Sequence, residues 1–369
     1  MDYKRELTIF SGVYSPMQVR RFVVMTLGGF FPVMQKLPDG RIGIVARGGD
    51  FHVGERGTLV FLTSSDGGES WSHATTIADD GPDNRNPSFG VAADGTLIVS
   101  HATVDLYKAG NWDPVKKGGS TNIRISRSED CGATWSSSEL MNGQGNEDWS
   151  GSGATGTNNP HSFYSPYGKM LTLADGTLLM EYYVMHKLPD GRRNSAVFIT
   201  RSKDGGRTWV DTVRIAEGHD ETALCDLGNG HILAVMRTTY TTKPITLQQT
   251  ESTDGGYTWS EPRIITGDGE YPADVIRLND GRLLLTYGRR EPPHGVQAMI
   301  SHDDGKTWDT EHKLFLVGDS STRDCGYPSS VQLDTGEVVT AYYACDPVSG
   351  GEEATRRLGT HAASLIYQP

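Results

Sequence analysis

The sequence predicts an all-β protein, a six-bladed β-propeller, and two interlocking repeats carry that prediction. The first repeat is the stretch Ser-x-Asp-x-Gly-x-Ser/Thr-Trp, which occurs five times. Its Asp and Ser can hydrogen-bond turn amides, its Gly takes a backbone angle closed to other residues, and its Trp covers a hairpin. We interpret it as a turn between two strands. The copies are residues 64–71, 128–135, 202–209, 252–259 and 301–308.

The second repeat gives the number of blades. An Asx-Gly turn between two apolar runs is the strongest short hairpin signal, and six such turns occur. Four of the five intervals between them are 55, 54, 51 and 54 residues, and the other is 81. A unit of about 50 residues with two hairpins is one four-stranded antiparallel blade. The turns are Asp39-Gly40, Asp94-Gly95, Asp175-Gly176, Asn229-Gly230, Asp280-Gly281 and Asp334-Thr335-Gly336.

The long interval and the chain ends complete the expected architecture. Two polar, Gly-rich insertions, 104–121 and 142–159, lengthen the second interval, and we expect both to be loops. The sixth unit has no Ser-x-Asp turn and ends after its third strand. We therefore expect an N-terminal segment such as residues 7–12 to supply the outer strand of the last blade. No linker interrupts the repeats, which predicts a single domain over residues 1–369.

Composition narrows the classes of partner. The net charge of −12 argues against nucleic acid. No apolar run approaches the roughly 20 residues that a membrane helix needs. The start of the chain is not a signal peptide, so we expect a cytoplasmic protein, or a secreted or periplasmic one if such a peptide has been removed. The oligomeric state stays open.

Cysteine spacing and known motifs give no sign of a metal or cofactor. The four cysteines lack metal-ligand spacing and are too few for a disulfide scaffold, so we expect free thiols. Nothing resembles a nucleotide-binding loop, a nucleophile elbow or an EF-hand, and we expect no cofactor. The cysteines are Cys131, Cys225, Cys325 and Cys345.

The strand order places the candidate site on one face of the ring. Both repeated turns lie at the same ends of the strands, so the segments before each inner strand and after each second strand lie on the opposite face. Carboxylates, arginines and aromatic residues concentrate in those segments. The candidates are Phe30, Phe31, Arg47, Asp50, His52, Glu55, Arg85, Glu221, Arg237, Tyr271, Asp274, Arg289, Arg290 and Tyr327.

The five Ser-x-Asp turns resemble the Asp-box repeats of the sialidase superfamily, and the resemblance spans essentially the whole chain. The family places a Glu before the inner strand of the fourth blade and an Arg at the end of its second strand, where this chain has Glu221 and Arg237. Its nucleophilic Tyr opens the last inner strand, as Tyr327 does in Gly-Tyr-Pro-Ser. A further family Arg corresponds to Arg289 or Arg290, and the spacing leaves open which.

The resemblance also implies an acid/base carboxyl and exposes one departure. The family's acid/base Asp sits in the loop that here holds Asp50, with His52 and Glu55 nearby. The family's first-blade Arg-Ile-Pro, whose Arg grips the substrate carboxylate, is Phe30-Phe31-Pro32 here. An aromatic ring cannot make that bidentate contact, so sialic acid does not carry over as the substrate. The two phenylalanines offer a stacking surface for a sugar ring instead, and Arg47 or Arg85 could replace the guanidinium.

These residues predict an exo-acting glycoside hydrolase with a carbohydrate or glycoconjugate substrate. Tyr327 is the expected nucleophile, Glu221 its base and Asp50, or failing that Glu55, the acid/base; Tyr271 is among the expected substrate contacts. A two-carboxylate glycosidase like the exo-arabinanases, with Glu221 paired to Asp274 or Asp50, is an alternative. So is a carbohydrate-binding propeller without catalysis. A lyase would need a His or Tyr base, for which His101, His161, His186 and His294 are available.

Overall fold

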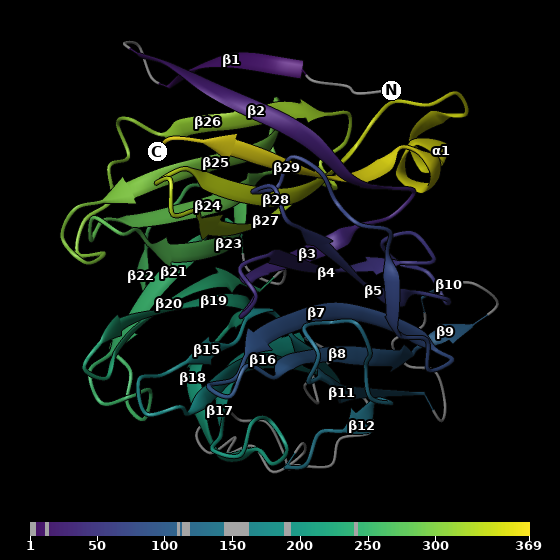
Figure 1. Ribbon diagram of the computed structural model, residues 1–369, viewed down its shortest axis with the longest axis vertical. Helices are drawn as coiled ribbons and strands as arrows, with labels where there is room; N and C mark the ends of the chain where they lie inside the picture. Colours follow the sequence, from purple (N-terminus) through teal and green to yellow (C-terminus); the bar gives the residue numbers. More distant parts are fainter. Residues whose placement is uncertain are drawn as a thin grey trace.

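The protein is an all-β, six-bladed propeller (Figure 1), as the repeats predict. The computed structural model describes residues 5–11, 15–108, 111–112, 119–143, 162–187, 193–239 and 243–369. The first three blades contain β3 (Phe30–Lys36), β4 (Ile42–Gly48), β5 (Thr58–Ser64) and β6 (Thr75–Ala78); β7 (Asp83–Val91), β8 (Leu97–Asp105), β11 (Ser120–Ser128) and β12 (Glu139–Leu140); and β13 (Phe163–Pro166), β15 (Leu171–Thr172), β16 (Leu178–Lys187), β17 (Arg193–Ser202) and β18 (Val210–Glu217).

The other three blades follow the same antiparallel order. They contain β19 (His219–Gly228), β20 (His231–Thr238), β21 (Leu247–Ser252) and β22 (Arg263–Ile264); β23 (Glu270–Arg277), β24 (Leu283–Arg289), β25 (His294–Ser301) and β26 (Leu314–Ser320); and β27 (Gly326–Gln332), β28 (Val338–Cys345), β29 (Thr360–Tyr367), β2 (Ser15–Thr26) and β1 (Arg5–Ser11). A short strand, β14 (Gly168–Lys169), pairs with β7 in parallel, and α1 (Gly351–Leu358) precedes β29. The apolar clusters lie mainly between neighbouring blades, such as the one shared by blades four and five.

The Ser-x-Asp repeat is confirmed as a turn, and the copy at Ser252 shows how it works. The Asp254 carboxylate accepts hydrogen bonds from the backbone N–H and hydroxyl of Thr258 and from the hydroxyl of Ser252. The Ser252 hydroxyl in turn accepts the Gly256 N–H at 2.8 Å. The Thr258 hydrogen bonds hold the pKa of Asp254 below its usual range. The turn is therefore held by an Asp carboxylate that accepts hydrogen bonds from residues of the same turn.

An N-terminal strand closes the ring, as predicted, but it is β2 and not residues 7–12. β2 pairs with β29, from Arg20 opposite Ile366 to Thr26 opposite His361. Residues 5–11 form β1, a fifth strand that pairs with β2 at the outer edge of the blade (Figure 1, top). The outer strand of a blade leads directly into the inner strand of the next blade. Of β1 and β2, only β2 can make this short connection, because three residues separate its end from the start of β3.

The first insertion is only partly a loop. β8 continues to Asp105 and β11 begins at Ser120, and between them β9 (Tyr107–Lys108) and β10 (Asn111–Trp112) form a small hairpin. The prediction of a loop over 104–121 was therefore wrong at both ends. The second insertion, 142–159, lies almost wholly outside the described residues. Within it, Asn142 exchanges two hydrogen bonds of 2.9 Å with the backbone of Trp209.

The four cysteines are free thiols, as predicted. Burial raises the pKa of Cys225 to about 12, so this thiol is protonated and unreactive at neutral pH. Among the described residues no cluster of His, Cys, Asp and Glu has the arrangement of a metal site. In the same part of the chain, no helix has both the length and the apolar character to span a bilayer.

Removing the closing strand is expected to destabilise the ring far more than removing β1. Val19 and Val24 of β2 are buried in the last blade and against the first. Each buried valine is worth about 1.5 to 3 kcal/mol, so deleting residues 1–26 should lower the free energy of unfolding by about 3 to 6 kcal/mol. Urea unfolding followed by tryptophan fluorescence measures it. Deletion of residues 1–14 is the control and should have a much smaller effect; equal losses would contradict the assignment of β2.

Candidate functional site

The inner strands bring their candidate residues to the ring centre through local irregularities. In five blades the ladder between the first and second strand shifts register near the start of the inner strand. A shift of this kind leaves residues unpaired and re-aims their side chains. The unpaired residues include Phe31, Asn86, Glu221, Tyr271 and Tyr327. The same backbone feature, repeated around the ring, therefore places all of these side chains except that of Tyr271 around one pocket.

Three of these residues hold a left-handed backbone. The φ angles of Phe31, Asn86 and Tyr327 are 54°, 50° and 52°. Each residue is followed by a proline. Left-handed non-glycine residues cost about 1 to 3 kcal/mol each and persist only where the surroundings fix them. Here the fixed backbone directs three side chains at one spot.

The irregular inner strands surround an open pocket of about 320 Å³. Below it, the channel between the inner strands narrows to about 10 Å³, enough for about one water molecule. Lys169 and Asp274 form an ion pair of 2.6 Å beside this narrow part. Phe31, Asn86 and Tyr327 line both the pocket and this narrow space, so the two adjoin. It is lined by Phe31, His52, Val53, Arg85, Asn86, Phe163, Tyr183, Met185, Glu221, Arg237 and Tyr327.

Tyr327 and Glu221 meet at the floor of this pocket. The Tyr327 hydroxyl donates a hydrogen bond of 2.7 Å to Glu221 Oε1, although the two residues come from β27 and β19. Both side chains are almost fully buried. Arg237 Nη1 lies 2.6 Å from Glu221 Oε2, and its Nε donates to Asp220 at 2.6 Å. Burial raises the pKa of Glu221, and the Arg237 charge offsets only part of that effect.

The two neighbouring arginines that the sequence could not separate lie in different places. Arg290 is buried, with its guanidinium 5.2 Å from the centre of the Tyr327 ring, and it donates to the Arg323 carbonyl at 2.6 Å. It also lies 5.5 Å from the Tyr271 ring, which is packed behind the site. Arg289 is half-buried and donates to the Pro292 carbonyl at 3.1 Å. Arg290 is therefore the one beside Tyr327.

Arg85 lies in the pocket and Arg47 does not. The Arg85 guanidinium is 5.7 Å from the Phe31 ring, and its Nε donates to Asn86 Oδ1 at 3.1 Å. Arg47 is fully buried and holds the loop at 49–57 together by donating to the Gly54 carbonyl at 3.1 Å and pairing with Asp83 at 2.5 Å. The expectation that Arg47 contacts substrate does not fit this placement, because its charge is paired with the buried Asp83 carboxylate.

The loop at 49–57, which Arg47 of β4 holds in place, also turns its carboxylates away from the pocket. Asp50 accepts hydrogen bonds from the N–H groups of Phe51 at 2.9 Å and Arg56 at 3.1 Å. It caps its own loop, and it is not part of the pocket lining. Glu55 is exposed and is not part of the lining either. The sequence placed the acid/base at Asp50 because it could not show which residue of the loop faces inward.

The remaining aromatic and carboxylate candidates lie behind or below the pocket. Of the two phenylalanines, Phe31 lines the pocket, whereas Phe30 packs beneath it against the Tyr343 ring at 5.2 Å. Asp274 accepts the Ser330 N–H at 2.6 Å in addition to its ion pair with Lys169. It lines the narrow channel rather than the pocket.

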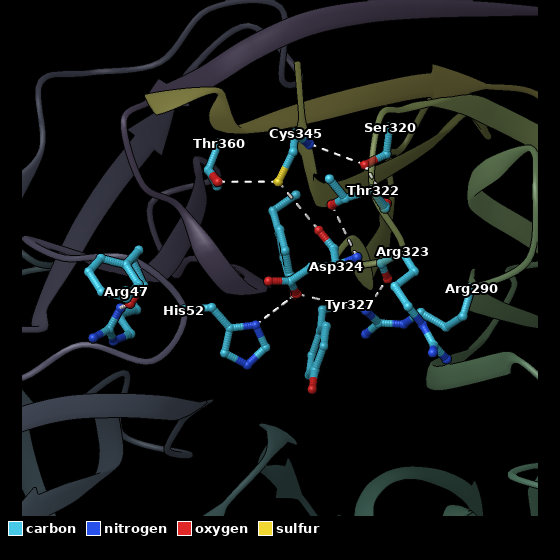
Figure 2. A network of polar contacts seen from close by, with 12 residues as sticks. Arg47, His52, Arg290, Ser320, Thr322, Arg323, Asp324, Tyr327, Cys345 and Thr360 are labelled. Atoms are coloured by element: carbon cyan, nitrogen blue, oxygen red, sulfur yellow. Dashed lines mark hydrogen bonds and ion pairs between the residues drawn. The ribbon is translucent and has the colours of Figure 1, made fainter. Parts of the chain in front are cut away.

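His52 is the titratable residue of the 49–57 loop that lines the pocket, next to Val53, and its partner was not predicted (Figure 2). His52 Nδ1 lies 2.7 Å from Asp324 Oδ1, and the Tyr343 hydroxyl donates to the same oxygen at 2.6 Å. Asp324 stands three residues before Tyr327, in a segment that the strand order already placed on this face. Asn86 and Tyr107 were also missed; Tyr107, from the insertion taken for a loop, donates to Asp83 at 2.6 Å.

Comparisons with known proteins fit this architecture. The sequence profile of the family described as "BNR repeat-like domain" matches residues 54–339. Among curated proteins, none matches the sequence. A crystal structure of a Dyadobacter fermentans protein of unknown function is 22% identical, with a TM-score of 0.76, over 95% of this chain and 99% of that one.

Two further solved structures are sialidases by title. The Hadza microbial sialidase Hz136 is 19% identical with a TM-score of 0.67, and the match covers 92% of this chain and 66% of the sialidase. The intramolecular trans-sialidase from Ruminococcus gnavus, in complex with oseltamivir carboxylate, is 15% identical with a TM-score of 0.61, over 92% of this chain and 94% of that one. At these identities the likeness establishes the fold.

A buried structural role for Arg47 predicts a large cost when its partner is neutralised. Asp83→Asn would leave the Arg47 charge buried without its counter-ion, and such a loss costs about 3 to 5 kcal/mol of unfolding free energy. Urea unfolding at neutral pH measures the effect. Asp334→Asn is the matched control, because Asp334 pairs with Lys36 on the surface and is fully exposed. It should cost less than about 1 kcal/mol. Similar costs for both variants would contradict the structural role.

Proposed function

The chain belongs to the BNR repeat-like domain family, and from that premise we propose that it is a glycoside hydrolase that removes a terminal sugar. The observation that carries the proposal is the hydrogen bond of 2.7 Å between the Tyr327 hydroxyl and the buried Glu221 carboxylate, on the floor of an open pocket. A binding site has no need of a phenol in contact with a buried carboxylate. A reaction that uses the phenol oxygen as a nucleophile does.

The proposed chemistry uses Glu221 to activate Tyr327. A neutral phenol, with a usual pKa of about 10, is a poor nucleophile. As the Tyr327 oxygen attacks the anomeric carbon of the sugar, its proton passes to Glu221. A base works best when its pKa lies near the working pH, and the raised pKa of Glu221 moves it in that direction. Water then releases the sugar from Tyr327, which gives retention of configuration over two displacements.

The shape of the pocket supports removal of an end sugar rather than cleavage within a chain. The pocket is open, and the narrow space that adjoins it between the inner strands admits about one water molecule. A sugar can therefore enter from its free end, but a polysaccharide cannot thread through. The Phe31 ring in the lining offers an apolar face against which a sugar ring can stack.

The charges in the pocket favour a glycone that carries an anionic or hydroxyl-rich group. Arg85 lines the pocket beside Phe31, close to where the resemblance leads one to expect the missing guanidinium. Arg237 lines the pocket as well, and its ion pairs with Asp220 and Glu221 fix its position. Two of the structural relatives bear sialidase in their titles, so a sialoside is one substrate to test.

The two-carboxylate alternative is less well supported. It needs a second carboxylate facing Glu221 across the substrate. Asp274 is held by Lys169 beside the narrow channel, and Asp50 is held by amides of its own loop. Within the described residues, Glu221 is the one carboxylate that lines the pocket. The Tyr327 and Glu221 pair is therefore the better basis for a mechanism.

Conservative changes at Tyr327 and Glu221 should abolish turnover without unfolding the protein. Tyr327→Phe removes the attacking oxygen and Glu221→Gln removes its base, so each should lower kcat/KM by at least about 100-fold. A panel of 4-methylumbelliferyl glycosides, including a sialoside, measures the activity, and thermal unfolding checks the fold. Retained activity in both variants would overturn the proposal. No hydrolysis by the wild type, together with measurable sugar binding, would favour a carbohydrate-binding propeller.

Arg85 is expected to act on substrate binding. Arg85→Met keeps an unbranched side chain but removes the charge, and a charged hydrogen bond is worth about 1.5 to 3 kcal/mol, or roughly 10-fold to 100-fold in affinity. We expect KM for the cleaved glycoside to rise by about that factor while kcat changes little. Arg289→Met is the matched control, because Arg289 lies outside the pocket lining. An unchanged KM in Arg85→Met would rule out this contact.

A further inference from the structure

A histidine and a carboxylate from two neighbouring blades form a second polar pair at the pocket. His52 Nδ1 lies 2.7 Å from Asp324 Oδ1. His52 comes from the loop after β4 in the first blade, and Asp324 comes from the segment before β27 in the last. The His52 side chain is 27% exposed and lines the pocket, whereas that of Asp324 is 13% exposed. The pair therefore presents its imidazole, not its carboxylate, to the pocket.

The imidazole is held in one orientation. Its ring packs edge-on against Phe31 at 4.9 Å and also contacts Phe30 at 5.9 Å. Because an ionised Asp324 only accepts hydrogen bonds, Nδ1 must be the donor and carries the proton. Nε2 is then the nitrogen that exchanges protons with a ligand. In Figure 2 this nitrogen and the Tyr327 hydroxyl point in the same direction, toward the lower part of the view, and both residues line the pocket.

Asp324 is itself fixed from several sides. The Tyr343 hydroxyl donates to Asp324 Oδ1 at 2.6 Å, and the Asp324 N–H donates to Thr322 at 3.2 Å. Arg290 Nη1 lies 3.9 Å from the same carboxylate oxygen. Burial opposes ionisation of Asp324, but the neighbouring imidazole, guanidinium and hydroxyl outweigh it and hold its pKa below the usual range. The carboxylate is therefore a fixed charge behind the ring.

The hydrolysis proposed above lacks a group that hands a proton to the leaving oxygen. The carboxylate of Asp50, the residue expected from sequence, accepts hydrogen bonds from the backbone N–H groups of Phe51 and Arg56. Glu221 is engaged by Tyr327. Of the described residues that line the pocket, His52 is the remaining group that can gain and lose a proton near neutral pH.

We propose that His52 is the acid/base of this site, with Asp324 as the positioning residue that sets its tautomer and direction. The inference rests on the proposed glycoside hydrolase function and deepens it. In the first step the bond from the anomeric carbon to the leaving oxygen breaks as the Tyr327 oxygen bonds to that carbon. The leaving oxygen takes the Nε2 proton of an imidazolium, and Glu221 takes the phenol proton.

The second step reverses the role of the ring. Neutral His52 removes a proton from water through Nε2 while the water oxygen bonds to the anomeric carbon. The bond from that carbon to the Tyr327 oxygen breaks, and the phenoxide recovers its proton from Glu221. Both carriers of protons, His52 and Glu221, end each cycle in the state in which they began it.

The surroundings of His52 predict how activity depends on pH. Burial lowers the pKa of His52; Asp324 works against this shift, and Arg85 and Arg290 add to it. The Tyr343 hydroxyl, 3.5 Å from Nδ1, also faces the ring. The first step needs the protonated ring, so kcat/KM should fall as the pH rises through the pKa of His52, below the usual value of about 6.5.

A comparison of two substrates with the same sugar tests the assignment. A 4-methylumbelliferyl group leaves without a proton, whereas a methoxide does not, so only the methyl glycoside needs the acid. For His52→Asn we expect kcat/KM on the methyl glycoside to fall by about 100-fold or more and that on the umbelliferyl glycoside to stay within a few-fold of wild type. Azide, which needs no base to attack, should then raise kcat of the variant on the umbelliferyl glycoside.

Asparagine is chosen because it distinguishes a role of His52 in proton transfer from a purely structural role, in which His52 would act as a latch that holds the first blade to the last through Asp324. Its amide N–H can replace Nδ1–H as donor to Asp324, so a latch between the blades survives while Nε2 is lost. An unchanged ratio between the two substrates, whether both activities persist or both fall, would overturn the assignment of His52.

Asp324→Asn tests the positioning role through the pH profile. The Asp324 carboxylate favours the protonated ring, so its loss should lower the pKa of His52 and move the alkaline limb of kcat/KM on the methyl glycoside to lower pH. A limb at the wild-type position would overturn the role of Asp324.

Failure of this inference can be told apart from failure of the proposed function. If Glu221→Gln and Tyr327→Phe are inactive but His52→Asn keeps the wild-type ratio, only the His52 assignment is wrong. If the wild type cleaves no glycoside, or the Glu221 and Tyr327 variants remain active, the hydrolase is wrong and this inference is overturned with it.

Discussion

The central constraint on this protein is the way its inner strands enter the ring. In five blades the inner strand turns a side chain out of its ladder near the point where the ladder begins, and a register shift does so. At Phe31, Asn86 and Tyr327 the shift requires a left-handed backbone before a proline. Tight packing offsets that strain: the Tyr327 ring lies 4.9 Å from Phe31 and 5.6 Å from Tyr343. A side chain held by both backbone and neighbours is already placed for chemistry.

Buried charges around the pocket are arranged so that nearly every carboxylate faces a cation. Arg237 lies between Asp220 and Glu221, and Lys169 lies against Asp274. Glu181 is different: burial and the neighbouring carboxylates Asp220 and Glu221 raise its pKa well above the usual range. A chain with a net charge of −12 can therefore still have two arginines in the lining of its pocket. The charge of the pocket depends on which side chains pair there and not on the net charge of the chain.

Much of the fold was readable from sequence because its signals are local. A turn motif stabilised by its own side chains forms wherever it occurs, so its repeats give the number and direction of the strands. Tyr327 and Glu221, 106 positions apart, could be placed together because each stands at the start of an inner strand. The choice between β1 and β2 was not local, since both are strands and only pairing with β29 distinguishes them.

The sequence could not show which residue of the 49–57 loop faces the pocket, because that depends on the direction of each side chain within the loop. Asp50 and His52 are two residues apart, and sequence places both near the pocket. Arg47, fully buried, donates to the Asp50 carbonyl at 3.0 Å and so fixes the loop with the Asp50 side chain turned toward its own amides. That arrangement brings His52 inward to Asp324. It depends on Asp83, the partner of Arg47 in the second blade, which no analysis of the loop alone could identify.

Closure of the ring and assembly of the site are the same event. The pocket takes Phe31 and His52 from the first blade and Tyr327, backed by Asp324, from the last. Those blades are joined by the short passage from β2 to β3, where Gly29 has a φ of 82° and a Cβ would lie 2.5 Å from that of Ala362. Because only glycine fits this approach, it sets how closely the first blade meets the last. The approach of Gly29 to Ala362 and the contact of His52 with Asp324 both join the first blade to the last.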